Sequence, residues 1–500
     1  MEHSHLTSIL DHLIGSVPFL GPELILILTF VCSICSSLFV DRIWKNSTLL
    51  ISLIGIACSM YMLGTQLSSQ SPTVFFDMIT IDRFSIYSRL LIAGAGLVIV
   101  LFIDQYFAFN HFRKRSNDIY PIVLASLIGM NILTMTNNWL LAFIGIEMIS
   151  IASYVLVGFL SQDKKESEAA MKYVLFGSVC AAVMLYGISL LYGFSGNLTF
   201  NSVDHIKGLI DAPELVVTIT TLFILTGIGF KMGFVPFHIW TPDVYQGAPT
   251  PITAFLSTLP KVAIIVFLVR LYTAWSDTPF YFSDLIYYIL MAASVLTMLL
   301  GNLAALQQQD VKRMMAYSSI GHTGILLMMI LVYTANEPQV LLYYLYSYVL
   351  MNLASFIFIG QLEQQTKQTS VASYAGLGKR YPVVFVAFTF ILISLIGLPP
   401  TAGFVGKLLI FSSVLDVYQE DNYAGLLILL IVGALTAVIS LFFYFRIPLQ
   451  AFLRKSDSLV DTPDLKWTPL FVIALLCTVS VFILGIFPGW LIDHFTKILD

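Results

Sequence analysis

Charged residues are scarce in this 500-residue sequence. Lys, Arg, Asp and Glu make up only 11% of it, and 58% of the residues are hydrophobic. A water-soluble domain carries about 25% charged residues on average, so this chain lacks the charge needed to cover a water-facing surface. The net charge of −4 is small, and no basic patch suited to nucleic acid is present. The composition indicates an integral membrane protein and gives no sign of nucleic-acid binding.

Cysteine is also scarce, with five residues in the chain. Cys32 and Cys35 form a C-x-x-C pattern inside an apolar run. We interpret them as small residues on a lipid-facing or packed helix, because thiolate ligands need polar access. The sequence contains no motif for haem, flavin, zinc or an iron–sulfur cluster. It therefore predicts no cofactor and no metal in this chain.

Long apolar runs dominate what is present. A helix that crosses a bilayer needs about 20 mostly apolar residues, and we count fourteen such segments. Their approximate ranges are 22–40, 47–67, 84–104, 119–136, 139–160, 168–192, 215–238, 251–273, 282–305, 312–333, 339–361, 381–412, 423–446 and 467–487. The runs are continuous and do not alternate, unlike the ~10-residue strands of a membrane β-barrel. We predict an all-α polytopic membrane protein that forms a single membrane domain.

Basic residues gather in alternate connections between these segments. They are Arg42, Lys45, Arg113, Lys114, Arg115, Lys164, Lys165, Lys312, Arg313, Lys367, Lys379, Arg380, Arg454, Lys455 and Lys466. The remaining connections, such as WSDTPFYFSD and DVYQEDN, are acidic or neutral. The positive-inside rule places the basic set in the cytoplasm. With an even number of spans, both termini then lie on the non-cytoplasmic side.

Several ionisable residues lie within or beside the apolar runs, where a charged side chain carries a free-energy cost of insertion into the membrane. A Lys or Asp at the centre of a spanning helix costs roughly 2.5 to 3.5 kcal/mol on insertion scales. The candidates for a functional role are Glu147, Lys172, Lys231, His238, Lys261, His322 and Lys407. Such residues often carry protons across membranes, so we predict that they form a proton-transfer set.

Glu147 and Lys261 are the strongest candidates, because both lie near the middle of their runs. The alternative for Glu147 is a structural carboxyl bonded to another helix. For Lys261, which follows Pro260, the alternative is that its amine reaches the membrane surface, which requires a place near a helix end. Burial disfavours the charged form of an amine, so a lysine at this depth is suited to exchange a proton.

Lys172 and His322 leave two interpretations open. Lys172 lies four residues after Glu168, so it either pairs at the membrane surface or pairs with Glu147 on the adjacent segment. His322 is either a packing residue or a proton shuttle, since the unperturbed pKa of histidine is about 6.5.

Two segments are interrupted by glycine and proline, and each holds one lysine. They are GIGFKMGFVPFHIW (Gly227–Trp240) and SLIGLPPTAGFVGKLLIF (Ser394–Phe411). Both are expected to be discontinuous helices, which at membrane depth are tolerated only inside protein or beside water. His238 lies two turns after Lys231 and would share its face in a continuous helix.

The two broken segments are the seventh and twelfth spans. An odd offset of five reverses direction across the membrane, which fits inverted repeats. We predict three N-terminal helices over 22–118, one five-helix repeat over 119–273, a second over 282–446, and a last helix over 467–487.

Three stretches resemble a known family. FKMGFVPFHIWTPDVYQGAPTPITAFLSTLPK, QQDVKRMMAYSSIGHTG and GLPPTAGFVGK are similar to the antiporter-like subunits of NADH:quinone oxidoreductase, respiratory complex I. HIWTPDVYQGAPTP resembles the N subunits in particular, and the resemblance covers nearly the whole chain. It implies proton transfer by Glu147, Lys172, Lys231, Lys261 and Lys407, with His238 and His322 at matching family positions.

The resemblance also implies partners and a location. It implies a subunit without a redox centre of its own, in a complex whose other subunits hold NAD, FMN, iron–sulfur clusters and quinone. Neighbouring antiporter-like and small membrane subunits would be its contacts in a bacterial inner membrane. Two alternatives stay open: a subunit of a multi-subunit cation/proton antiporter, and a subunit of a membrane-bound hydrogenase-type complex.

Overall fold

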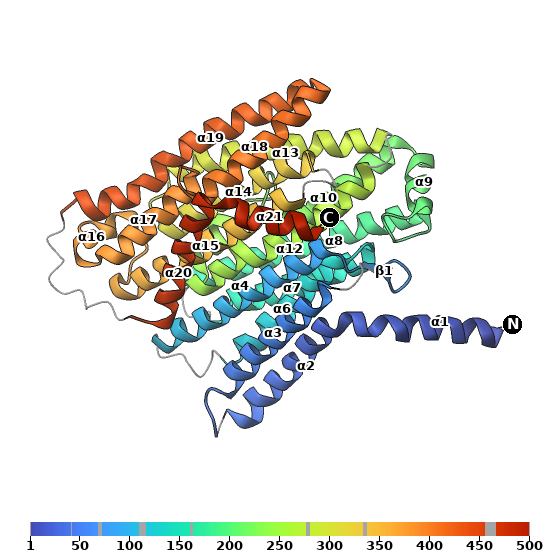
Figure 1. Ribbon diagram of the computed structural model, residues 1–500, viewed down its shortest axis with the longest axis horizontal. Helices are drawn as coiled ribbons and strands as arrows, with labels where there is room; N and C mark the ends of the chain where they lie inside the picture. Colours follow the sequence, from blue (N-terminus) through green and yellow to red (C-terminus); the bar gives the residue numbers. More distant parts are fainter. Residues whose placement is uncertain are drawn as a thin grey trace.

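The computed structural model of the chain is a bundle of α-helices, most of which run side by side along the long axis of the molecule (Figure 1). It describes residues 2–41, 43–68, 73–109, 117–160, 164–276, 281–333, 338–455 and 467–499. The prediction of an all-α membrane fold is confirmed at this level, with one two-stranded hairpin as the described exception.

The chain before residue 110 forms the N-terminal part of the bundle. Its elements are α1 (Glu2–Ser16), the 3₁₀ turn η1 (Val17–Leu20), α2 (Gly21–Cys35) with its π-helical end η2 (Ser36–Val40), α3 (Ser47–Gln66), β1 (Thr73–Val74), β2 (Ile79–Thr80) and α4 (Arg83–Phe109). The strands pair antiparallel, with Thr73 opposite Thr80. Helix α1 extends away from the bundle (Figure 1), and the sequence did not lead us to expect it.

Seven helices follow between residues 119 and 276. They are α6 (Ile119–Met135), α7 (Trp139–Val157), α8 (Lys164–Ser195), α9 (Val203–Asp211), α10 (Glu214–Met232), α11 (Trp240–Gly247) and α12 (Thr250–Ser276). Several of these helices begin at a polar residue that lies between two apolar runs. The side chain of Asn138, for example, accepts a hydrogen bond of 2.9 Å from the backbone N–H of Leu140 at the start of α7, which satisfies a free donor of the first turn.

The remaining elements complete the bundle. They are α13 (Tyr281–Leu306), α14 (Val311–Leu331), α15 (Pro338–Thr366), η3 (Val371–Tyr374), α16 (Leu377–Arg380), α17 (Pro382–Ile396), α18 (Ala402–Asp421), α19 (Ala424–Pro448), η4 (Leu449–Leu453), α20 (Pro469–Ile486) and α21 (Pro488–Leu499). Most apolar segments expected from the sequence fall on one of these helices. The segment expected at 381–412 is divided between α17 and α18, and the one expected at 215–238 continues past the end of α10 at Met232.

Within the described residues, twelve helices are long and apolar enough to cross a membrane, and Ile119–Met135 and Pro382–Ile396 are shorter apolar helices. The chain is thus a multi-pass membrane protein. The count of fourteen spans remains a prediction.

Three helices form the centre of the bundle. Nearly every residue of α12, α14 and α15 is buried, whereas outer helices such as α3, α8 and α19 expose large apolar side chains. The central helices carry polar and ionisable side chains such as Lys261 and His322, which are unfavourable against lipid. Pro260 lies within the continuous helix α12, so it does not end the helix that carries Lys261.

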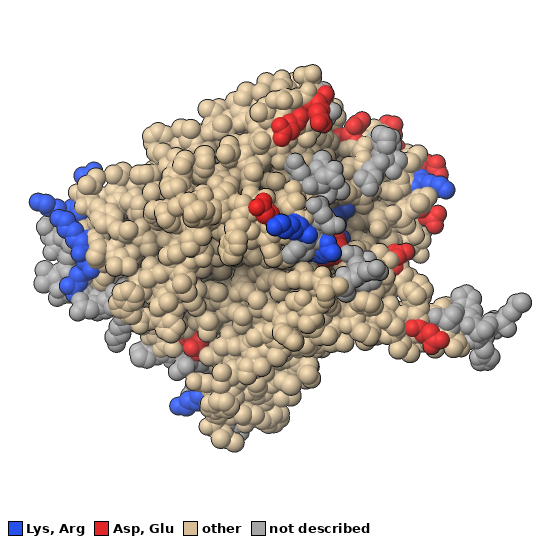
Figure 2. Space-filling model, in the orientation of Figure 1, with Lys and Arg blue, Asp and Glu red and all other residues tan. Residues whose placement is uncertain are grey.

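Charge is distributed unevenly between the two ends of the bundle. On the face shown in Figure 2, several Lys and Arg lie at the end where α16 lies, whereas Asp and Glu lie mostly toward the opposite end, where further Lys and Arg are also present. We refer to these as the basic end and the acidic end. Lys312 is an exception to the expectation of an exposed basic residue: it is buried, and its amine donates 2.7 Å to the carbonyl of Ala248.

Candidate functional site

The first expected helix break is present between α10 and α11. Helix α10 ends at Met232, and Gly233 adopts a left-handed conformation with φ of 71°, which glycine adopts without steric cost. The break frees carbonyl groups at the end of α10. The carbonyl of Phe230 is satisfied by the indole N–H of Trp240 at 2.8 Å.

The second break lies between α17 and α18, and here a lysine satisfies the freed groups. Helix α17 ends at Ile396, followed by Gly397 with φ of 91°. The amine of Lys407 donates to the carbonyls of Leu395 at 2.9 Å and Ile396 at 2.8 Å. A cation is favourable at a helix C-terminus, where carbonyl groups lack partners.

The two lysines lie on opposite sides of their breaks. Lys231 precedes Gly233 and belongs to the first half-helix, whereas Lys407 follows Gly397 and belongs to the second half-helix. The sequence patterns showed that both segments break, but they did not show this difference.

The fit of Lys407 against Gly397 gives a testable prediction. A Cβ added at Gly397 would lie 2.8 Å from Cδ of Lys407, while one added at Gly196, also left-handed with φ of 64°, meets nothing within 4 Å. Either change to alanine costs about 1–2 kcal/mol in backbone strain. We expect Gly397→Ala to lower the midpoint of thermal unfolding more than Gly196→Ala, because it alone also displaces Lys407 from the end of α17. Equal midpoints for the two variants would contradict this.

Lys231 lies in an aromatic and hydroxyl-lined site between α7, α8 and α10. Its amine is 3.3 Å from both the hydroxyl of Ser150 and that of Tyr173. It also lies 5.6 Å from the ring centroid of Tyr173 and 5.9 Å from that of Tyr154, a favourable cation–π geometry. Tyr173 is in turn stacked on Trp240, so the first break positions the site.

Glu147 lies on α7, one turn before Ser150. It is half-buried, and its Oε1 atom is buried without a hydrogen-bond partner. Its carboxylate interacts electrostatically with Lys231, although Ser150 and Tyr173 supply the hydrogen bonds of that amine. Glu147 also lies along the exposed side of α7, in line with Ile144 and Ile151.

Lys261 is held against α14 by three hydrogen bonds. Its amine donates to the hydroxyl of Ser319 at 2.7 Å, to the carbonyl of Ser319 at 2.9 Å and to the hydroxyl of Thr323 at 2.9 Å. The hydroxyl of Thr323 also lies 3.4 Å from the carbonyl of Met232, the residue next to Lys231. Thr323 therefore connects the amine of Lys261 to the backbone next to Lys231, whereas the amine of Lys231 contacts Ser150 and Tyr173.

His322 lies between Lys261 and Lys407. It interacts electrostatically with both lysines, and its Nδ1 atom is 2.8 Å from the hydroxyl of Tyr344. His322 and Lys407 share the wall of a small cavity with Ser318 and Tyr444. The volume of this cavity is about 10 Å³, close to what one water molecule needs.

Lys231, Lys261, His322 and Lys407 thus form one buried row across the bundle, between 3% and 6% exposed. We call these four residues the buried row. Glu147 adjoins it at the Lys231 end.

The structure places Lys172 and His238 differently from the buried row. Lys172 pairs with Glu168 at 2.7 Å and with Asp243 at 2.7 Å, which agrees with the surface-pairing alternative and not with a direct pair to Glu147. His238 lies on the turn between α10 and α11, with its Nδ1 atom buried and without a hydrogen-bond partner. The amine of Lys231 makes its hydrogen bonds with Ser150 and Tyr173 and not with His238.

Asp243 is the centre of a charged cluster at the basic end that the sequence reasoning did not single out. Its other oxygen accepts 2.6 Å from Arg313. Burial opposes ionisation of Asp243, but the hydrogen bonds from Lys172 and Arg313 outweigh it and hold the pKa of this carboxyl below its ordinary value. The cluster joins α8, α11 and α14.

The sequence also contains a second charged group that we did not predict, an ion pair between Arg89 and Glu23 in the N-terminal helices. Arg89 donates 2.9 Å to Glu23, and Asn131 donates 3.1 Å to the same oxygen. Both charged side chains are buried inside the N-terminal helices. The signal was available, because Arg89 lies within the apolar segment 84–104.

No group of three or more His, Cys, Asp or Glu side chains suited to a metal ion occurs in the part of the chain that the structure describes. The five cysteines are free, and Cys32 and Cys35 are exposed.

Comparison with known proteins identifies relatives of this arrangement. The family described as NADH:quinone oxidoreductase/Mrp antiporter, TM, matches residues 136–440. NADH-quinone oxidoreductase subunit N 2 of Chloroherpeton thalassium is 37% identical over 448 residues, which is 88% of this chain and 86% of the relative.

Two solved structures share the fold. A chain of respiratory complex I from Thermus thermophilus with bound aureothin is 28% identical, with a TM-score of 0.75, over 94% of this chain and 98% of that one. A chain of the archaeal membrane-bound sulfane sulfur reductase is 22% identical, with a TM-score of 0.81, over 95% and 97%. This second likeness concerns the fold alone.

The broken helices and the buried row are thus features of an antiporter-like membrane subunit, the class that the matching family defines. Within this class, the chain belongs to the family of NADH-quinone oxidoreductase N subunits. Its relatives are components of multi-subunit membrane complexes.

Proposed function

We propose that this chain is a proton-translocating subunit in the membrane arm of an NADH:quinone oxidoreductase. The observation that carries the proposal is the buried row: four ionisable residues lie inside the bundle, and His322 interacts electrostatically with the lysines on both sides of it, Lys261 and Lys407. Ionisable residues inside a membrane protein are costly and mark proton or ion paths. A subunit that only anchored its neighbours would not need them.

In this mechanism Glu147 stabilises the protonated form of Lys231. A conformational or electrostatic change that begins where quinone is reduced, in another subunit, weakens this interaction. Lys231 then releases its proton, which passes by Lys261 and His322 to Lys407. From Lys407 it leaves to the non-cytoplasmic side, and Lys231 is reprotonated.

The hydroxyl groups along the row suit this transfer. Ser319 lies between Lys261 and Tyr348, with its Oγ atom 2.7 Å from the amine and 3.0 Å from the phenol oxygen. Hydroxyl groups donate and accept hydrogen bonds at the same time. Together with the cavity beside Lys407, which suits one water, they bridge groups that do not touch.

Lys172 and His238 belong to the same proposal in outer positions. Lys172, paired with Asp243 at the basic end, would exchange protons with the cytoplasm. His238, on the turn of the first break, would lie where water reaches the end of α10.

We further propose that the membrane domain contains two inverted repeats, one over 119–273 and one over 282–446, after N-terminal helices over 22–118 and before a last helix near 467–487. In support, α10 and α17 both end at a left-handed glycine and resume after a turn. Two such breaks in corresponding halves are typical of transporters built from repeats.

The partners in this proposal are the other subunits of the complex. They would hold NAD, FMN, iron–sulfur clusters and quinone, and they would carry all electron transfer. A neighbouring membrane subunit would cover the part of α7 around Glu147, since Leu140 and Ile144 are exposed beside it. A carboxylate left facing lipid there would be unfavourable.

The chain would lie in a bacterial inner membrane with its basic end in the cytoplasm and both termini on the other side. The positive-inside rule supports this orientation, because the Lys and Arg at the α16 end in Figure 2 have few acidic side chains among them.

The first test is a native gel of the tagged chain, extracted in mild detergent and stained for NADH dehydrogenase activity. The proposal requires the tag to migrate with a large NADH-oxidising band. If the tag instead migrates with antiporter or hydrogenase subunits, apart from that activity, the proposed proton path would stand, but the energy source would not be NADH oxidation.

A further inference from the structure

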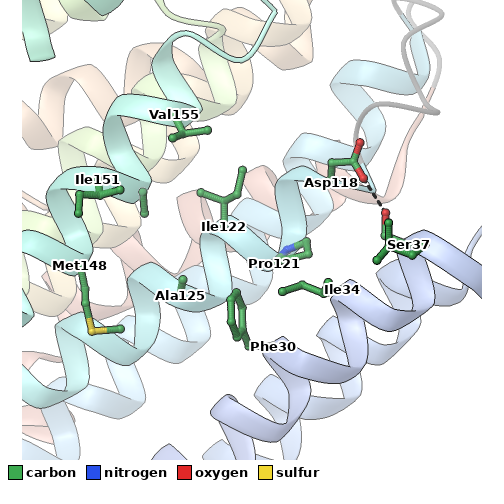
Figure 3. A pocket seen from close by; sticks show the side chains of 12 residues that line it. Phe30, Ile34, Ser37, Asp118, Pro121, Ile122, Ala125, Met148, Ile151 and Val155 are labelled. Atoms are coloured by element: carbon green, nitrogen blue, oxygen red, sulfur yellow. Dashed lines mark hydrogen bonds between the residues drawn. The ribbon is translucent and has the colours of Figure 1, made fainter.

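An apolar groove opens between α2 with its end η2, α6 and α7, close to the basic end (Figure 3). Its volume is about 510 Å³. Phe30 and Ile34 form one wall, Ile122 and Ala125 the floor, and Ile151 the other wall. Among the described residues that line it, Ser37 and Asp118 are the polar ones, and both lie at its mouth.

The groove is held open by contacts at both ends of α2. At the acidic end, Glu23 is bonded to Arg89 of α4 and to Asn131 of α6. At the basic end, the hydroxyl of Ser37 donates 2.6 Å to the carboxylate of Asp118 (Figure 3). Between these attachments the apolar side chains of α2 and α7 face one another across the groove. An empty space of this size would lose the dispersion contacts of its lining.

The length of the groove distinguishes two kinds of occupant. Its lining residues span 30–38 on α2 and η2, 118–125 on α6 and 148–155 on α7. Eight or nine helical residues extend about 12 Å, less than half of the ~30 Å hydrocarbon core. A helix from a partner subunit crosses the whole core, whereas a single acyl chain from the nearer leaflet reaches only its middle. The groove therefore matches an acyl chain.

The mouth carries the charges that a zwitterionic headgroup would need. Asp118 is exposed at the start of α6 and presents a carboxylate that accepts hydrogen bonds from an ammonium group. The side chain of Asn117, next to Asp118, donates 3.3 Å to the backbone carbonyl of Lys45, so the backbone of an exposed basic residue lies near the same rim. An ammonium at Asp118 and a phosphate near Lys45 would both be compensated.

We propose that this groove is a specific lipid site, which binds one acyl chain of a phospholipid of the phosphoethanolamine type in the leaflet at the basic end. The ammonium headgroup is held by Asp118, and the chain fills the space between α2 and α7. The site stabilises the attachment of α2 and α3 to the rest of the bundle. It does not depend on the proton-transfer role of the buried row.

The test uses the intact complex, reconstituted with phosphatidylethanolamine that carries a photoreactive diazirine on one acyl chain. We expect labelling of the α7 segment that contains Met148, Ile151 and Val155. Ala125→Phe fills the floor of the groove and should lower this labelling at least about tenfold, which corresponds to about 1.4 kcal/mol of binding. Ala182→Phe, an equal change at an exposed position of α8, should leave it unchanged.

A second probe with an anionic phosphatidylglycerol headgroup tests the role of Asp118. The wild-type groove should label better with the ethanolamine lipid, and Asp118→Asn should remove this preference. The proposal is overturned if the α7 segment of the wild type is unlabelled, if Ala125→Phe labels as the wild type does, or if crosslinks join the groove to a partner helix instead. Should Ala125→Phe fail to assemble, the headgroup preference of the wild type and its loss in Asp118→Asn decide the matter alone.

Discussion

Replacing Lys261 by methionine is expected to abolish proton transfer through this subunit while the complex still assembles. Lys261 donates three hydrogen bonds to α14 and lies between Lys231 and His322 in the buried row. Removal of a positioned proton-transfer group typically slows the transfer by about 10²–10⁴-fold. Methionine has a similar length and suits an apolar interior, so the loss should be functional. The measurement is the number of protons pumped per NADH by the complex in proteoliposomes.

Two further variants separate proton transfer from a role for charge alone. Lys261→Arg keeps a cation but cannot release a proton near neutral pH, so we expect it to fail as methionine does. Lys207→Met removes an exposed lysine on α9 and should pump normally. If arginine restored full pumping, the positive charge would suffice, and Lys261 would not be a proton carrier.

The second large effect is on stability and concerns Arg89. Its side chain is completely buried and Glu23 nearly so. Arg89→Met would leave the carboxylate of Glu23 buried without its cation, which typically costs about 3–5 kcal/mol. We expect less assembled complex and a lower midpoint of thermal inactivation.

The double variant Glu23→Gln with Arg89→Met should recover most of this loss, because no charge is left uncompensated. Arg454→Met, at an exposed position of the basic end, is the matched control and should behave as the wild type. A double variant as unstable as Arg89→Met would show that packing of the arginine, and not the ion pair, holds these helices together.

The helices could be predicted from the sequence because membrane insertion demands long apolar runs, and the breaks because glycine and proline interrupt two of them. The burial of Lys231, Lys261 and Lys407 could also be expected, since each lies within an apolar run, whereas the role of His322 was left open between packing and proton transfer. Whether all of them transfer protons remains a prediction.

Partners of these side chains could not be predicted, because they depend on which helices face each other. Nothing in the sequence pairs Lys261 with Ser319 and Thr323, more than fifty residues away. The capping of α17 by Lys407 is visible only when α18 is folded back against it. Lys172 shows the same limit. Its distant partner Asp243 lies on α11, a short helix after the first break, and no apolar run in the sequence predicts this helix.

The central claim is that Glu147 and the buried row carry protons, and one measurement tests it most directly. Lys231→Ala and Glu147→Ala would each be introduced, assembly checked on a native gel, and protons pumped per NADH measured together with coupled quinone reductase activity. The account predicts that both variants assemble and that both quantities fall in each. Full coupled pumping in both variants would contradict it.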